Sequence, residues 1–178
     1  MPIEQVNKAT VTSATSDVQL TGINTDDIYM LVGTGIEIAV NTAYLQTRVV
    51  KDVSGTPTTL SANNYKNAAS VFRGNSSFQS YSNNGTPRTE LYFGGAQPIS
   101  NDVSGESANC LFYLHNFNNA YEYSSIIGQD MFIMDSGTQL CGNVGGTQYA
   151  VDEAHIGISI SGYSTNITSG EFTLYKLT

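Results

Sequence analysis

Two histidines are the only side chains in this 178-residue chain whose ordinary pKa suits proton transfer near neutral pH. General-base catalysis would therefore depend on His115 or His155. Neither lies near the G-x-S-x-G turn that presents a catalytic serine in hydrolases, and their spacing matches no metal-binding motif. We expect both histidines to be structural, and we expect no enzymatic activity.

The acidic residues offer two other kinds of chemistry. Two carboxylates that face each other across a cleft can cleave glycosides, and oxygen-rich loops can bind calcium. The clustered acids are Asp26/Asp27, Asp130/Asp135 and Asp152/Glu153. Each pair flanks or follows a turn, where carboxylates commonly cap backbone amides and stay solvated. We expect no cofactor and no bound metal; the alternative is calcium, with Asp26, Asp27, Asp130 and Asp135 as candidate ligands.

The two cysteines, Cys110 and Cys141, are too few for a disulfide framework and belong to no CxxC motif. Cys110 opens the run Cys-Leu-Phe-Tyr-Leu, which predicts a buried strand thiol and not a reactive one. A disulfide between the two cysteines is not predicted.

Aromatic and amide side chains concentrate in residues 112–123. A carbohydrate site would need such a surface, because aromatic rings stack on sugars and amides bind their hydroxyl groups. The candidate ligand-binding residues are Tyr113, Asn116, Asn118 and Tyr121. The alternative, which we favour, is that alternate aromatics fill the core while the asparagines form a turn. The absence of Trp weakens the carbohydrate interpretation further.

These residues must be positioned by strands, because short apolar runs separated by turn residues recur along the whole chain. Ile156, Ile158 and Ile160 alternate with other residues, and a period of two marks a strand with one buried face. Turn signals lie at 52–57, 83–87 and 145–146. Any helix must be short, and the best candidate is a turn at 63–69.

The pattern predicts an all-β protein, an antiparallel jelly-roll-like sandwich of two sheets in a single domain. Residues 1–14 would form an N-terminal arm and the first strand, and residues 15–178 the sandwich. We expect the arm at 1–7 to be loose or to dock on a neighbour. Longer connections, at 55–65 and 94–108, suit crossings between two sheets.

Composition limits the partners. The formal net charge is −8, and only 12% of residues are charged, with no cluster of basic residues. Nucleic acid and anionic membranes both require such clusters, so neither is expected as a partner. The sequence shows no apolar run long enough to span a membrane and no secretory signal, which predicts a protein made in a cytosol. A tyrosine-rich, uncharged surface suits rigid contact faces.

Both ends of the chain carry short motifs: VQLTGI at 18–23, DIYMLV at 27–32, IGISI at 156–160 and NITSGEFTLYKL at 166–177. They resemble the first and last hairpins of jelly-roll domains in virion proteins of tailed phages, particularly marine phages. The run YLQTRVV at 44–50 is similar to the strand that follows the first hairpin in those domains.

The resemblance implies a structural virion protein, usually trimeric, with no catalytic residues to carry over. Because the domain starts near residue 15, we expect a capsid decoration (cement) subunit and not a tail-fibre subunit with a long attachment segment. Its partners would be the major capsid protein or another virion protein, and sister subunits in a homotrimer that meet along an uncharged strand face. It would be assembled in the host cytoplasm and reside on the virion surface. The alternative is a receptor- or carbohydrate-binding domain of a tail fibre or appendage, with a cell-surface glycan as its ligand.

Overall fold

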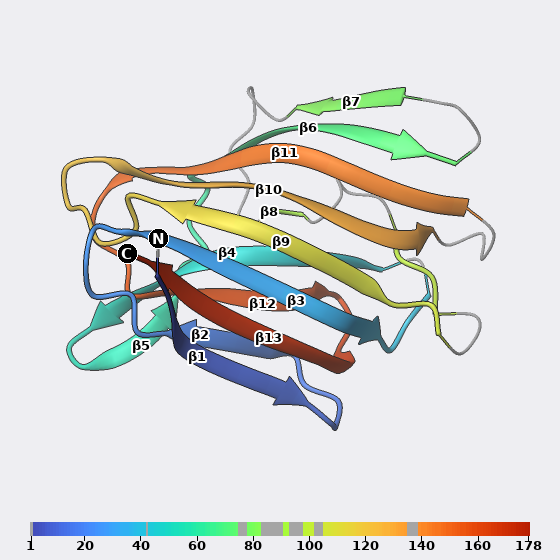
Figure 1. The fold of residues 1–178 in the computed structure, drawn as a ribbon, viewed down its shortest axis with the longest axis horizontal. Coiled ribbons are helices and arrows are strands. Elements are labelled where there is room, and N and C mark those ends of the chain that lie inside the picture. The colour runs from blue at the N-terminus through green and yellow to red at the C-terminus, as the bar shows by residue number, and fades with distance from the viewer. Residues whose placement is uncertain are drawn as a thin grey trace.

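The computed structural model describes residues 2–41, 43–74, 78–82, 91–92, 98–101, 105–134 and 139–178. It confirms the all-β prediction, because two antiparallel sheets face each other as a sandwich in one domain (Figure 1). The strands are β1 (Ile3–Val11), β2 (Asp17–Thr21), β3 (Ile28–Ile38), β4 (Tyr44–Val53), β5 (Thr56–Thr59), β6 (Tyr65–Arg73), β7 (Phe78–Ser82), β8 (Leu91–Tyr92), β9 (Ala108–His115), β10 (Tyr123–Met134), β11 (Gln139–Asp152), β12 (Gly157–Tyr163) and β13 (Ile167–Leu177). Within the described ranges, no helix is long and apolar enough to cross a membrane.

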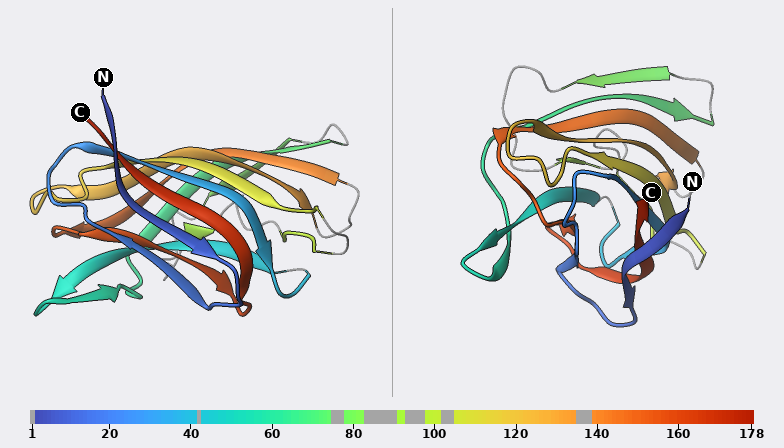
Figure 2. Two further views of the ribbon diagram at one scale, coloured as in Figure 1. Left: turned by 60° about the horizontal axis from the view of Figure 1, so that its bottom comes forward. Right: turned by 60° about the vertical axis from the view of Figure 1, so that its left-hand side comes forward.

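The two sheets differ in size. The larger sheet has eight strands in the order β1-β13-β3-β9-β10-β11-β6-β7. The smaller has the order β2-β12-β4-β5, with β8 also paired to β4. Figure 2 shows both layers from two further sides. The core lies between them, where alternate side chains of each strand point inward: Leu31 and Leu174 pair in the larger sheet, and Ile158 lies between Leu20 and Val49 in the smaller one.

The two terminal segments that were predicted as hairpins are arches, in which consecutive strands belong to different sheets. Strands β2 and β12 lie in the smaller sheet, whereas β3 and β13 lie in the larger one. The arches stack on each other, because β2 pairs with β12 and β3 pairs with β13. The hairpin prediction was wrong because apolar alternation identifies a strand but not the strand that it pairs with.

The N-terminal segment is part of the larger sheet. Strand β1 pairs with β13 from Ile3 opposite Leu177 to Val11 opposite Gly170. Residues 1–7 were expected to be loose or to dock on a neighbour, but from Ile3 onward they dock on the chain's own last strand. The two termini consequently lie side by side (Figures 1 and 2).

Some local predictions failed where tertiary contacts decided the conformation. The helical turn expected at 63–69 is wrong, because Tyr65 begins β6 and its buried ring packs in the core. The hydroxyl of Tyr65 donates to the Leu60 carbonyl at 2.8 Å and accepts from the Val49 amide at 3.1 Å. These contacts tie the start of β6 to β4 in the opposite sheet.

The predicted turns had three different outcomes. The turn at 52–57 is confirmed, because Ser54 and Gly55 have positive φ values of 55° and 83° and join β4 to β5. The turn predicted at 83–87 lies outside the described residues. The turn predicted at 145–146 is wrong, because both glycines lie inside β11, paired with β10 and β6.

The neighbouring glycines Gly145 and Gly146 give a matched pair of stability tests. A Cβ atom at Gly145 would lie 2.6 Å from the Ala69 Cβ atom, whereas one at Gly146 would meet nothing closer than 3.6 Å. We expect Gly145→Ala to lower the free energy of unfolding by about 1–3 kcal/mol through overpacking. Gly146→Ala should leave it nearly unchanged. Urea denaturation of both variants measures this, and equal losses would contradict the assigned strand register.

Candidate functional site

The four residues predicted to bind a ligand lie on strand β9 and on the connection that follows it. Tyr113 lies on β9, opposite Ile127 of β10 and Met30 of β3. Asn116, Asn118 and Tyr121 lie in the connection between β9 and β10, where Tyr121 is 89% exposed. Asn116 has a φ of 58°, the turn conformation expected from the favoured alternative. Carbohydrate binding through these residues stays a prediction.

The aromatic side chains next to these residues are divided between the core and the surface. Phe117 is completely buried and Phe112 packs against the core. In the loop, the side-chain Oδ1 of Asn119 accepts a hydrogen bond from the Tyr121 backbone amide at 2.9 Å, while its Nδ2 donates to the Asp26 carboxylate, also at 2.9 Å. The aromatic-and-amide segment is therefore used partly for packing and partly for loop structure.

The candidate calcium ligands are separated. Asp27 forms an ion pair with Lys176 at 2.9 Å and accepts a hydrogen bond from Thr25 at 2.7 Å, and both contacts hold the pKa of Asp27 below its ordinary value. Asp130 lies inside β10, level with Gly33 and about 20 Å along the sheet from Asp27. Asp135 lies outside the described residues.

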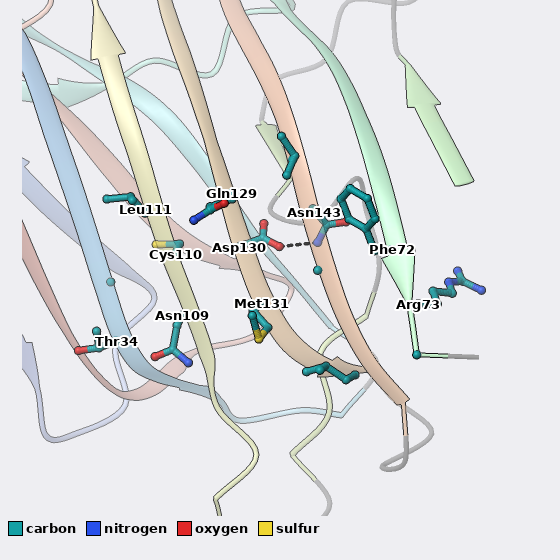
Figure 3. Close-up of a pocket in the computed structure, with 15 residues that line it drawn as sticks. Thr34, Phe72, Arg73, Asn109, Cys110, Leu111, Gln129, Asp130, Met131 and Asn143 are labelled. Atoms are coloured by element: carbon teal, nitrogen blue, oxygen red, sulfur yellow. Dashed lines mark hydrogen bonds between the residues drawn. The ribbon is translucent and has the colours of Figure 1, made fainter. Parts of the chain in front are cut away.

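A calcium site therefore stays a prediction. Within the described ranges, no three His, Cys, Asp or Glu side chains come together in a way that could hold a metal ion. Asp130 is buried and accepts a hydrogen bond from the amide of Asn143 on the neighbouring strand (Figure 3).

Both cysteines are free and buried, as predicted for Cys110. Strand β10 lies between the strands that carry Cys110 and Cys141, so their Cα atoms are at least about 9 Å apart. A disulfide needs Cα atoms closer than about 7 Å. Burial raises the pKa of both thiols, which makes them poor nucleophiles.

His155 is the centre of a buried polar cluster that was not apparent in the sequence. Its Nδ1 atom lies 2.7 Å from the Ser124 hydroxyl, and its Nε2 atom lies 3.5 Å from Glu153. Lys51 in turn contacts Glu153 at 2.5 Å. The ring of Tyr149 packs edge-on against the imidazole, with ring centres 5.1 Å apart. No sequence signal pointed to this cluster, because its members come from β4, β10, β11 and the segment before β12.

The order Ser–His–Glu has the residue types of a nucleophile, a base and an orienting acid. However, Ser124 is only 1% exposed, and its hydroxyl also donates to the Asn116 carbonyl at 3.3 Å. A nucleophile must be reached by its substrate, and this one is enclosed. The cluster therefore links β10 to the segment before β12, and His155 has a structural role in it.

A more accessible feature lies on the surface of the larger sheet that faces away from the smaller sheet. We call it the outer face and define it by these side chains: Leu111 and Tyr113 of β9, Ile127, Gln129 and Met131 of β10, Leu140 and Val144 of β11, Phe72 of β6, and Phe78 of β7. The strand register places them in rows, for example Phe78–Phe72–Gly142–Met131. The rings of Phe72 and Phe78 pack edge-on at 5.1 Å.

Many of these apolar side chains are accessible to solvent. Ile127, Met131, Leu140 and Val144 are between 49% and 54% exposed, and Phe78 is 76% exposed. Single exposed apolar residues are normal on a protein surface, but a contiguous patch commonly marks an interaction site. The outer face is therefore the best candidate site in the described structure.

A groove of about 610 Å³ runs across the outer face. It is lined from β3, β9, β10, β11 and β6, and Figure 3 shows Thr34, Asn109, Leu111, Met131 and Phe72 around it. Its depth has a simple cause: Gly142 contributes no side chain between Phe72 and Met131. A Cβ atom at this position would meet only the Asp130 carbonyl, at an ordinary 3.6 Å.

The outer face carries almost no charge. Across residues 66–73, 109–115, 125–133 and 140–148, the charged residues are Lys66, Arg73 at the edge of the groove, and the buried Asp130. An uncharged apolar surface can be dehydrated at low cost, unlike one that carries ionised groups. From the sequence we expected sister subunits to meet along an uncharged strand face, but the strands that form such a face could not be identified without the structure.

The His155 cluster makes stability depend on pH. Burial lowers the pKa of His155 from 6.5 to about 4, although Glu153 acts in the opposite direction. Between these two values the unfolded chain binds a proton that the folded chain does not. Stability should therefore fall as pH drops from 6.5 towards 4, with up to about 3 kcal/mol due to His155.

Urea unfolding at several pH values measures this effect against two variants. His155→Gln should flatten the dependence on pH in this window, even if it lowers stability at pH 7. His115→Gln changes the half-buried histidine of β9 and should keep the wild-type slope. Equal slopes in the wild type and His155→Gln would show that His155 is not the responsible group.

Compared with known proteins, the chain matches no protein-family model and no curated protein sequence. Its function must therefore be argued from its own residues and geometry. The feature with the clearest functional meaning is the outer face.

Proposed function

We propose that this chain is a structural virion protein of a tailed phage, a capsid decoration (cement) subunit that binds the capsid and sister subunits. The outer face carries the proposal, because a protein that acts by contact needs an accessible apolar surface with little charge. The resemblance of the end segments to phage jelly-roll domains supports the same role independently. Those segments occupy β2, β3, β12 and β13.

In this proposal the protein works through binding energy alone, with no catalytic step and no cofactor. A subunit that binds only the folded, assembled shell stabilises that shell by mass action. A rigid two-sheet sandwich suits this task, because its contact residues lie on strands and little order has to be gained on binding. The major capsid protein is the expected partner, at the virion surface.

A second candidate function is receptor or carbohydrate binding by a tail-fibre or appendage domain. It is favoured by the exposed tyrosines around the connection between β9 and β10, where Tyr121 is 89% and Tyr123 is 41% exposed. Tyrosine offers a ring for stacking and a hydroxyl for hydrogen bonding. Unlike the outer face, this connection has polar groups that form hydrogen bonds with one another, such as Asn119 with Tyr121.

The first proposal can be tested with phage heads that lack this subunit, taken from a mutant of the phage that encodes it. We expect the purified chain to co-sediment with these heads in a saturable manner and to raise their melting temperature, because binding favours the assembled lattice. Heads of an unrelated phage are the control and should show neither effect. A specific signal on a glycan array, without binding to heads, would instead support the second candidate.

A further inference from the structure

We propose that the outer face is the surface on which a second copy of this chain docks, with the groove above Gly142 receiving an apolar side chain of that copy. The inference rests on the proposed function and names the partner for this face. It assigns contact between sister subunits to β9, β10, β11, β6 and β7, and leaves capsid binding to other surfaces.

Short runs of β9 and β10, at 110–114, 126–127 and 131–134, are apolar on both sides of the sheet. Inward-pointing Leu114, Ile126 and Phe132 fill the core, while Tyr113, Ile127 and Met131 alternate with them on the outer face. A half-buried strand normally alternates apolar and polar residues, and a continuous apolar run is typical of a strand that is buried on both sides. These runs of the outer face therefore have the composition of a covered surface.

The distribution of charge favours another copy of the same chain as the cover. With a formal charge of −8, two copies repel each other over most orientations. The outer face avoids this repulsion, since Asp130 is its only acid within the four strand segments given above and is turned into the protein. A strongly basic partner would meet no exposed acid within these segments, and a strongly acidic partner would meet only two cations, Lys66 and Arg73 at the edge of the groove.

The outer face is large enough to form a specific interface between two copies of the chain. Five strands spaced by about 4.8 Å, each contributing about seven residues, span roughly 24 Å by 24 Å. This corresponds to about 600 Å² per copy and about 1,200 Å² for two copies, which exceeds the ~1,000 Å² expected of a specific interface.

The outer face carries an apolar side chain that projects into solvent and an apolar hollow that could receive such a side chain. Phe78 is the most exposed of the large apolar side chains on the outer face and lies on β7, the edge strand of the described sheet. The hollow at Gly142 lies two strands away in the same row, bordered by Phe72 and Met131. A face with both features can contact a second copy reciprocally, or in a closed ring such as a trimer.

Three single variants test the inference, with the mass in solution measured by sedimentation at micromolar concentration. The wild type should sediment as a multiple of the 19.1 kDa chain. Met131→Lys places a charge in the interface and should weaken self-association at least about tenfold, since an unpaired buried charge is costly. Val53→Lys changes a residue of similar exposure, 49% against 53%, at the end of β4, and should leave the mass unchanged.

Gly142→Leu separates specific docking from general stickiness. A Cβ atom at Gly142 makes only an ordinary contact and the groove of about 610 Å³ lies above it, so we expect the fold to survive, as circular dichroism can verify. The variant adds apolar surface, so non-specific association would become stronger. Docking into the hollow predicts the opposite, a weakening of self-association at least about tenfold.

Two results would overturn the inference: a wild type that is monomeric at every concentration tested, or a folded Gly142→Leu variant that associates as well as the wild type. Binding to phage heads, measured separately, tests the proposed function. Self-association without head binding would retain the inference and refute the capsid role. A chain that binds phage heads but stays monomeric would refute the inference and retain the capsid role.

Discussion

The insertion of β13 between β1 and β3 is the constraint on which the rest of the structure depends. This strand pairs along its length with both neighbours and brings the two ends of the chain together. Because β13 follows β12 through an arch, its position also places β12 next to β2 in the opposite sheet. One long-range pairing thus fixes the relative position of the two layers. Such contacts, distant in sequence, form at a high entropic cost and are characteristic of β-sandwiches.

Once the layers are placed, the pleat of each strand decides which side chains reach the core and which reach solvent. In β10 the residues Ile126, Asp130 and Phe132 point inward, and Ile127 and Met131 point outward. The same alternation across β9, β11 and β6 assembles the outer face without any loop taking part. An interaction surface built on paired strands is rigid before a partner arrives, so its binding energy is not spent on ordering flexible segments.

The polar groups inside the protein serve its architecture. The Ser124–His155–Glu153–Lys51 cluster joins elements of both sheets, and burial keeps the imidazole neutral at physiological pH. Asp130 and Asn143 bond to each other on the inner side of the strands that carry the groove. In the described part of this chain, the accessible surface with a distinct character is the apolar outer face, and the proposed role rests on it.

The sequence by itself determined the fold class, because a period of two between apolar residues is a local property that each strand displays independently. It also predicted the turn at Ser54 and Gly55, where local backbone preferences suffice. Only the tertiary structure decided that the end segments are arches, that Gly145 and Gly146 continue a strand, and that His155 meets Ser124. In each case the deciding contact joins residues far apart in the chain. The outer face belongs to the same group, since residues from five strands form one surface only after the register between those strands is set.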